Sequence, residues 1–225
     1  MSASTSLSQS ARETNPPYGE KTAIEPQRFI FYSANWDFYN SMWNLLDGRR
    51  LRLTYDRGTL EIMSPAPMHE NYSRIIDRLV HEYTLAANLE IYSLGSTTWR
   101  RKILERGLEP DSCYYTTHQP QMWNKTDIDL DKDPPPDLCI EIDITSSSLN
   151  RMGIYAALGV PEVWRHDGES LTFLHLENGA YVRKPISLSF PKLPLAELNR
   201  FIHLRQTTME NVLIRQFQAA AKAWL

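Results

Sequence analysis

One strand-like segment of the sequence carries three acids that would lie on the same side. In an extended strand successive side chains point to opposite faces, so Asp137, Glu141 and Asp143 share one face. Like charges on a short strand raise each other's pKa unless a positive charge compensates. A divalent cation with oxygen ligands supplies such a charge compactly. The segment therefore indicates a metal site.

The same alternation is also typical of a half-exposed strand whose acidic face is solvated. The flanking sequence favours a site over that alternative. Three prolines precede the segment, and the Thr-Ser-Ser-Ser stretch at 145–148 follows it and offers N-cap hydroxyls for a helix predicted over 149–158. Sheets of α/β proteins bind ligands at such junctions, at the carboxyl ends of their strands.

A partner for Glu141 is predicted on a second strand, which begins at Asp111. Consecutive strands are often neighbours in space, and these two would then bring one carboxylate each to a shared end. Mg²⁺ typically takes only one or two protein carboxylates and completes its octahedron with water. A water bound in this way becomes a nucleophile for a phosphodiester. Asp111 and Glu141 are therefore the predicted ligands of Mg²⁺, with Mn²⁺ as a substitute.

The elements that position these acids follow from hydrophobic periodicity and turn signals. Apolar side chains at helical spacing predict an amphipathic helix over 69–89. Two β-prone runs joined by Asp56-Arg57-Gly58 predict a hairpin over 50–63, and two Gly-containing turns predict a small meander within 162–182. Other strands are expected at 90–94, 97–101 and 111–116, and other helices at 35–46, 195–204 and 208–225.

Length and composition fit a single domain. The chain has 225 residues, of which 42% are hydrophobic, enough for one sizeable core. We expect this domain over 26–205, after a disordered leader over 1–25. A C-terminal amphipathic helix over 206–225 would pack on the domain or at a dimer interface. Two cysteines, no signal peptide and no apolar run that could span a bilayer predict a cytoplasmic protein without membrane contact.

The charge balance limits how the chain could bind nucleic acid. With 24 basic and 27 acidic residues the net charge is -3, which excludes the strong positive excess of a general nucleic-acid binder. Any DNA contact must therefore be local. Short basic clusters are more often solvated surface than phosphate clamps. The first such cluster is Arg49, Arg50 and Arg52. The second, beside Trp99, is the candidate DNA contact and comprises Arg100, Arg101 and Lys102.

Several blocks of the sequence form a recognisable series: 58–65, His69 at the start of a helix, 109–111, 136–142 and 154–164. In this order they resemble the Uma-type restriction endonucleases of the PD-(D/E)XK nuclease superfamily, and the similarity covers about residues 30–205. The resemblance implies a restriction-endonuclease-like α/β core, with a mixed central β-sheet flanked by helices and extra β-hairpins. It also implies metal-dependent cleavage of double-stranded DNA, with Asp111 and Glu141 as the metal ligands.

The lysine of the superfamily signature is replaced in this chain. Two residues after Glu141, where the signature has lysine, stands Asp143. Relatives often carry a lysine four residues before the tyrosine that matches Tyr155, and that position is Arg151. Arginine keeps the positive charge and can fork onto a phosphate, but it stays protonated and cannot accept a proton as a neutral lysine can. Catalysis would then depend on the metal-bound water.

Two weaker candidates and two further functions remain open at this stage. Lys102 precedes the Asp111 strand and could supply the missing amine, and Glu70, beside His69, matches a region where relatives direct acids toward the cleft. Favourable interaction with the helix N-terminus accounts for Glu70 equally well. The alternative function is a catalytically degenerate protein that binds DNA or a protein partner without cleavage. A glycosidase-like carboxylate pair is disfavoured by the resemblance, and double-strand cleavage would favour a homodimer.

Overall fold

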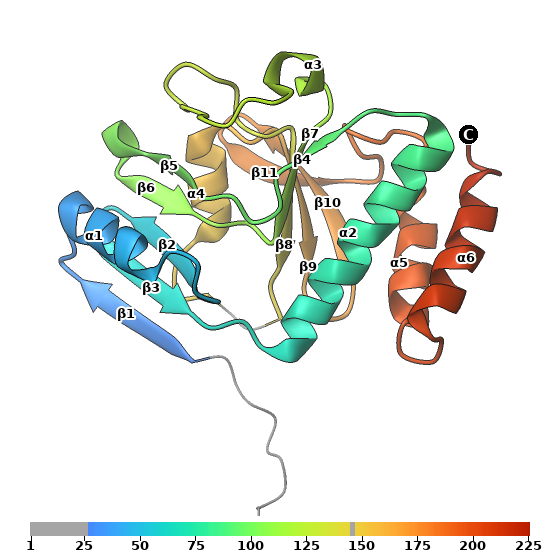
Figure 1. Cartoon of the computed structure of the whole chain (residues 1–225), viewed down its shortest axis with the longest axis horizontal. Helices are drawn as coiled ribbons and strands as arrows, with labels where there is room; N and C mark the ends of the chain where they lie inside the picture. Colours follow the sequence, from blue (N-terminus) through green and yellow to red (C-terminus); the bar gives the residue numbers. More distant parts are fainter. Residues whose placement is uncertain (1–26, 145–146) are drawn as a thin grey trace, which may run out of the picture.

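The computed structural model describes residues 27–144 and 147–225. The predicted leader over 1–25 lies outside the described residues, as do Thr145 and Ser146. Two β-sheets stand side by side, with helices on their faces (Figure 1). The predicted mixed α/β class is therefore confirmed.

The N-terminal sheet is antiparallel and has the order β1-β3-β2-β6-β5. The predicted hairpin is present as β2 (Arg52–Asp56) and β3 (Thr59–Met63), and its turn needs the positive φ of 92° that Gly58 adopts readily. Two strands of this sheet were not predicted: β1 (Arg28–Tyr32) at one edge, and β6 (Arg106–Leu108) between β2 and β5. β5 (Trp99–Arg101) pairs with β6, and helix α1 (Trp36–Leu46) covers the sheet.

The second sheet is mixed and has the order β11-β10-β9-β8-β7-β4. β8 (Leu138–Ile142), the strand with the acids, pairs parallel with β9 (Glu162–His166) and antiparallel with β7 (Ser112–Tyr115). The predicted meander continues from β9 into β10 (Leu171–Glu177) and β11 (Ala180–Lys184), and β4 (Tyr92–Ser93) forms the other edge. All five residues of β8 are buried, so the alternative of a half-exposed strand with a solvated face is wrong.

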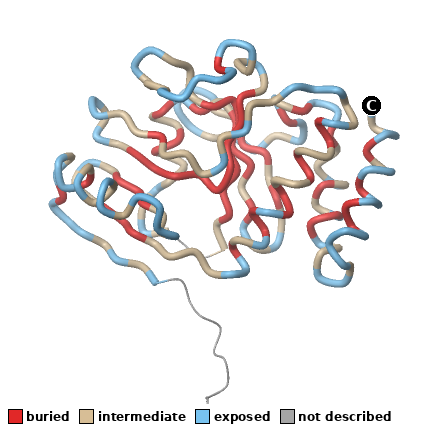
Figure 2. The backbone as a smooth tube through the Cα atoms, in the orientation of Figure 1, coloured by how far each residue is buried: buried red, intermediate tan, exposed pale blue. Residues whose placement is uncertain are grey.

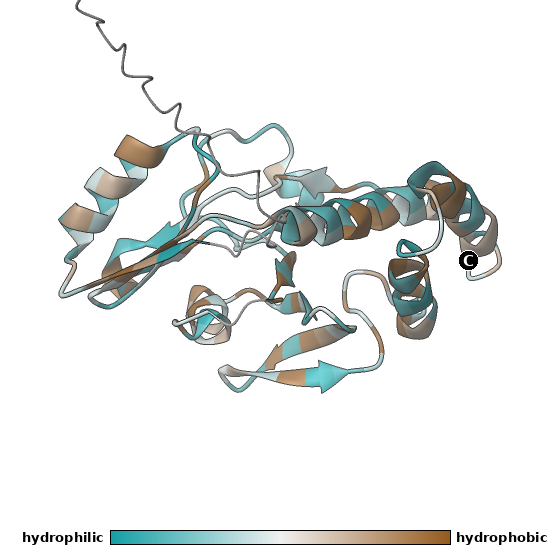
Figure 3. Cartoon of the chain, turned by 90° about the horizontal axis from the view of Figure 1, so that it is seen from below, coloured by the Kyte–Doolittle hydropathy of each residue, from teal (hydrophilic) through white to brown (hydrophobic). Residues whose placement is uncertain are grey.

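Helices cover both faces of this mixed sheet and bury its apolar side chains. The predicted amphipathic helix is α2 (Pro67–Ala87), which packs on one face with α5 (Leu195–Leu204) and α6 (Glu210–Ala221). On the other face lies α4 (Arg151–Leu158), which connects the parallel strands β8 and β9. The core runs through the centre of the molecule (Figure 2), and the helices alternate hydrophilic and hydrophobic surface (Figure 3).

Short elements complete the described chain. The segment between β7 and β8 contains a short helix, α3 (Gln119–Met122). A 3-10 turn, η1 (Lys102–Leu104), connects β5 to β6. No helix within 27–144 and 147–225 is long and apolar enough to cross a membrane.

Candidate active site

Asp111 lies where the chain passes from one sheet to the other. β6 of the first sheet ends at Leu108, and β7 of the second begins at Ser112, so residues 109–111 connect the two sheets. The β7–β8 register pairs Ser112 with Ile140, and its extension by one residue sets Asp111 opposite Glu141. The backbone N–H of Ile142 donates to Oδ2 of Asp111 at 2.8 Å. The two strands are therefore neighbours, as expected, and bring both acids to the same end.

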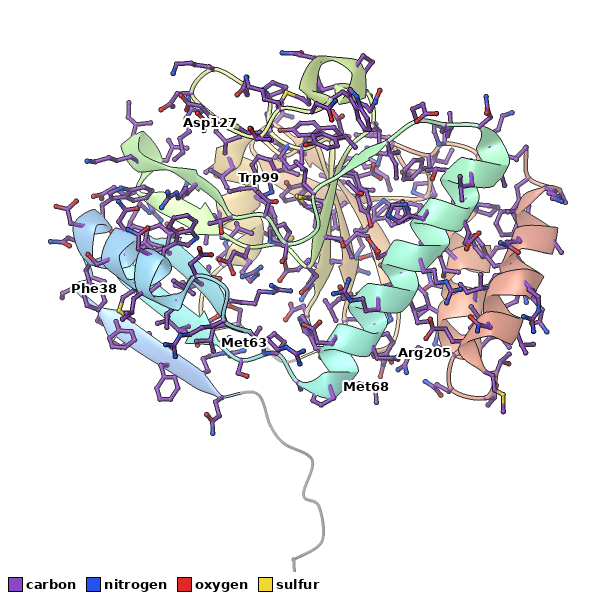
Figure 4. All side chains as sticks on the ribbon, in the orientation of Figure 1. Phe38, Met63, Met68, Trp99, Asp127 and Arg205 are labelled. Atoms are coloured by element: carbon purple, nitrogen blue, oxygen red, sulfur yellow. The ribbon has the colours of Figure 1, made fainter. Side chains whose placement is uncertain are left out.

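The two acids line a small, partly open cavity between the sheets. Its volume is about 20 Å³, which is room for about one water molecule. Met63, labelled in Figure 4 near the end of β3, contributes to the wall. Most of the lining side chains are charged, and five of them are acids: Glu61, Glu109, Asp111, Glu141 and Asp143. The positive charges are fewer and comprise Arg28, Arg52 and Arg151, with His69 beside them.

Arg151, the first residue of α4, holds Glu141 through a forked ion pair. Its Nε donates to Oε1 of Glu141 at 2.5 Å and its Nη2 donates to Oε2 at 2.9 Å. The same guanidinium donates to the hydroxyl of Thr54 on β2 and, at 2.8 Å, to the backbone carbonyl of Glu109. Arg151 thus joins α4, both sheets and the connection between them at one point.

The ion pair is almost completely buried. The side chain of Arg151 is 12% exposed and that of Glu141 is 6% exposed, so water cannot replace the contacts they make. The hydroxyl of Tyr155 donates to Oε2 of Glu141 at 2.7 Å from the next turn of α4. Burial by itself lowers the pKa of Arg151, but the surrounding groups, chiefly the Glu141 carboxylate, together outweigh burial and raise that pKa above its usual value. Arg151 is therefore a permanent cation in this site.

Asp111 is held in a different environment from Glu141. Burial, and to a lesser extent the Glu141 charge, raise the pKa of Asp111 to about 6, although His69 opposes the rise. Nε2 of His69 lies 3.4 Å from Oδ1 of Asp111, and Nε of Arg52 lies 3.9 Å from the same oxygen. Nδ1 of His69 and Nε of Arg52 are buried without a hydrogen-bond partner in the described chain. Polar atoms at this site therefore have unused bonding capacity.

Glu61 and Glu109 are two buried site acids that the sequence analysis missed. Glu61, 2% exposed in the middle of β3, accepts from the Ser147 hydroxyl and the Ser148 backbone N–H, both at 2.9 Å. Glu109 accepts from the Thr98 hydroxyl at 2.9 Å, and burial raises its pKa. The available signal was an acid between the apolar residues of β3, and an acid next to the Pro-Asp of the second block.

The serines after β8 do not cap α4, so that prediction was wrong for the described ones. The N-cap residue is Asn150, whose Oδ1 accepts from the backbone N–H of Gly153 at 2.9 Å. Ser147 and Ser148 instead bind Glu61 on β3. Because Glu61 is buried, hydrogen bonds from these serines satisfy oxygens that water cannot reach. The serine-rich stretch therefore ties the end of β8 to the other sheet.

The three acids of the β8 face have three different partners and do not share one cation. Asp137, at the start of the strand, accepts from the backbone N–H of Thr116 at 2.8 Å, away from the cavity. Glu141 pairs with Arg151, as described. Asp143 accepts from Arg165 of β9 at 3.0 and 2.5 Å and stands at the edge of the cavity. The initial interpretation of one metal site along this face is thus replaced by the Asp111–Glu141 pair.

The weaker candidates lie outside the cavity. Lys102 is exposed in η1, at the end of the β5–β6 hairpin that is remote from Glu109, and it is not among the described residues that line the cavity. The structure therefore does not support Lys102 as the missing amine. Glu70 is half-buried in the first turn of α2, with Oε1 at 3.8 Å from Nη2 of Arg52.

The two arginines next to Lys102 are engaged elsewhere. Arg100 donates to Asn40 at 2.6 Å, and its guanidinium lies 4.0 Å from the ring centroid of Trp43. Arg101 donates to Asp131 at 2.7 Å. These contacts hold β5 to α1 and to the loop after α3. The basic cluster at 100–102 is therefore largely a structural feature of the first sheet.

The donor chemistry at Asp111 and Glu141 fits a hard cation. Two carboxylates from neighbouring strands are the kind of ligands that Mg²⁺ takes from proteins. Within the described residues, however, no group of three or more His, Cys, Asp or Glu side chains is placed to hold a metal ion. Both oxygens of Glu141 accept hydrogen bonds from Arg151 and Tyr155. A cation at Glu141 would have to share these oxygens with the guanidinium.

The mixed sheet, the β8–α4–β9 crossover and the paired acids between neighbouring strands define an α/β domain of the restriction-endonuclease-like class. Comparison with protein families agrees with this class. The model of the Uma2 family, described as putative restriction endonuclease, matches residues 36–206. Because the match covers well over half of the chain, this protein belongs to the Uma2 family. No curated protein matches the chain.

Proposed function

We propose that this protein is a DNA endonuclease that hydrolyses phosphodiester bonds at the cavity of Asp111 and Glu141. The observation that carries the proposal is the juxtaposition of these two acids, from antiparallel neighbouring strands, at one buried cavity between the sheets. Membership of a family described as putative restriction endonuclease supports it. Double-strand cleavage would require two such sites, so a homodimer remains an expectation.

Mg²⁺, held by Asp111 and Glu141, would activate a water molecule and offset the charge on the phosphate oxygens. The residues of the chain supply positioning. Arg151 and Tyr155 fix the orientation of the Glu141 carboxylate, and the Ile142 N–H fixes that of Asp111. Since Arg151 remains protonated, it can hold a phosphate oxygen or a carboxylate but cannot act as a general base.

A second candidate function has its own supporting observation. The guanidinium of Arg151 donates hydrogen bonds to both carboxylate oxygens of Glu141. Its positive charge therefore already neutralises the carboxylate that would otherwise bind a metal ion. A protein with this arrangement would bind DNA, or a protein partner, through the same region without cleaving it. The two candidates predict the same fold and differ only in metal-dependent chemistry.

Nicking of supercoiled plasmid in Mg²⁺ or Mn²⁺ separates the candidates. Wild type is compared with Asp111→Asn and Glu141→Gln, which keep the size of each side chain, and with the surface control Asp131→Asn. The endonuclease predicts nicking by wild type and by the control, with loss of at least about tenfold in both site variants. Equal nicking by all four proteins would refute the assignment of the site. Duplex binding without nicking by wild type would favour the second candidate.

A further inference from the structure

A broad groove lined by arginine side chains adjoins the cavity. It has a volume of about 1090 Å³ and lies between helix α2 and the loop that precedes β2. Its positive residues come from both walls: Arg49, Arg50 and Arg52 from the loop and start of β2, and Arg74 and Arg78 from α2. The acids that line it are Glu70, Asp77 and Glu210. The groove is therefore net positive in a chain whose net charge is -3.

The groove continues to the proposed catalytic acids. A smaller hollow of about 230 Å³ shares Arg52, Glu70 and Arg74 with the groove, and Asp111 also lines it. Arg52 lines the cavity of Asp111 and Glu141 as well. A ligand in the groove would thus lie next to Asp111 from the α2 side.

Most of the groove arginines are available to a ligand. Arg49, Arg50 and Arg74 are exposed, and their side chains have no ion pair or hydrogen bond with any residue of the described chain. Arg78 pairs with Glu210 at 2.7 Å, but this pair is itself largely exposed. The cluster at 100–102 differs, because Arg100 and Arg101 already have partners. Three arginines with unpaired side chains therefore lie in the groove, whereas both arginines of the cluster at 100–102 are already engaged.

The chemistry of the groove fits a phosphate backbone in duplex form. Arg74 and Arg78 are four residues apart on α2, so they project from the same helical face one turn apart. Guanidinium groups form forked, charge-assisted hydrogen bonds with phosphate oxygens. The described residues lining the groove include no Phe, Tyr or Trp, although binding of single strands relies on such rings for base stacking.

We propose that this arginine groove binds the phosphodiester backbone of double-stranded DNA, with Arg49, Arg50 and Arg74 as phosphate contacts, and directs the duplex toward Asp111. The inference rests on the proposed function for its ligand. It replaces the cluster of Arg100, Arg101 and Lys102 as the DNA-contacting surface. Phosphate contacts of this kind position a duplex without reading its sequence, so the groove would accept many sequences.

Fluorescence anisotropy with a labelled duplex, in EDTA and at several NaCl concentrations, tests the groove separately from cleavage. The variant Arg50→Gln/Arg74→Gln is compared with the control Arg183→Gln/Lys222→Gln, which removes two exposed positive charges outside the groove. The groove variant should raise Kd about tenfold or more at 0.1 M salt. The plot of the logarithm of the binding constant against the logarithm of the salt concentration has a negative slope. The magnitude of this slope should decrease by about 2, roughly one for each lost phosphate contact. The control should change neither quantity.

Equal changes in Kd for the groove variant and the control variant would overturn the proposal that the groove binds DNA. The proposal would also fail if the wild-type protein bound phosphatidylserine vesicles but not the duplex. The charge reversal Arg50→Glu/Arg74→Glu should weaken binding further, and unchanged binding by this variant would also overturn the proposal. The binding assay contains EDTA and therefore does not depend on metal-dependent cleavage. If the wild-type protein does not nick plasmid but its duplex binding depends on the groove arginines, the endonuclease proposal fails and the groove proposal stands. If the wild-type protein nicks plasmid but the groove variants bind duplex as tightly as wild type, the groove proposal fails and the endonuclease proposal stands.

Discussion

Replacing Arg151 by methionine should lower the free energy of unfolding by about 4 kcal/mol. Methionine preserves most of the side-chain volume and removes the charge, so the buried Glu141 carboxylate loses two of its three hydrogen bonds. Breaking a buried pair by removing one partner typically costs about 3–5 kcal/mol, because the remaining charge is uncompensated. The hydroxyl of Thr54 and the carbonyl of Glu109 also lose a donor.

Urea unfolding, followed by circular dichroism and tryptophan fluorescence, measures this change. For a domain of this size about 4 kcal/mol corresponds to a fall in Tm of roughly 10 °C. The matched control is Arg165→Met, which breaks the ion pair with Asp143. The side chain of Arg165 is 38% exposed, and pairs that water can reach contribute about 1 kcal/mol or less.

The double variant Glu141→Gln/Arg151→Met isolates the charge interaction. With both charges absent no buried ion is left unpaired, so the double variant should lose clearly less than the sum of the two single variants. We expect a coupling of at least about 2 kcal/mol, the range found for residues in one network. A loss below about 1 kcal/mol in Arg151→Met, or strictly additive losses, would refute the reasoning that Glu141 depends on this guanidinium.

Three further predictions concern stability. Burial lowers the pKa of His166 to about 4, outweighing Asp167, which raises it. Because the unfolded chain therefore takes up this proton first, stability should fall by at most about 3 kcal/mol as pH drops from 6.5 to 4. In His166→Phe this part of the pH dependence should be absent when the free energy of unfolding is measured by urea unfolding at each pH. If the free energy of unfolding of the variant fell with pH as steeply as that of wild type, the prediction would be contradicted. A Cβ on Gly107 would lie 2.5 Å from Oη of Tyr39 and 3.0 Å from Cβ of Arg100, so Gly107→Ala should cost about 1–3 kcal/mol; a Tm equal to wild type would argue against this crowding. Asn150→Ala should cost about 1 kcal/mol through loss of the α4 N-cap, and Asn150→Ser, which keeps an acceptor, should lose less.

Local sequence patterns predicted the elements with strong periodicity. α2 is amphipathic over many turns, and the hairpin of β2 and β3 has a Gly-containing turn, so each has a signal contained within its own residues. β6 was missed because it is only Arg106–Leu108, and β1 because it is paired with β3, a strand about thirty residues further along the chain. Such strands are defined by pairing with distant partners, which local periodicity does not record.

The candidate site divides in a similar way. Asp111 and Glu141 were found from the sequence, because two strands that follow one another became neighbours and the register aligned their acids. Glu61 and Glu109 were missed because they come from the first sheet and from the connection between sheets. Of the arginine groove, the sequence showed only the basic cluster at 49–52, since the arginines of the other wall belong to α2, some twenty residues later in the chain.

The alternation of side chains on β8 was determined by the sequence alone, because the period of two in a strand separates acids from apolar residues wherever the strand lies. Tertiary structure decided what each acid does. Burial between two sheets made Glu141 dependent on Arg151, while an open edge let Asp143 pair with Arg165. The physical reason is that the energy of a charge depends on its partners and on its access to water, and only the folded chain defines either.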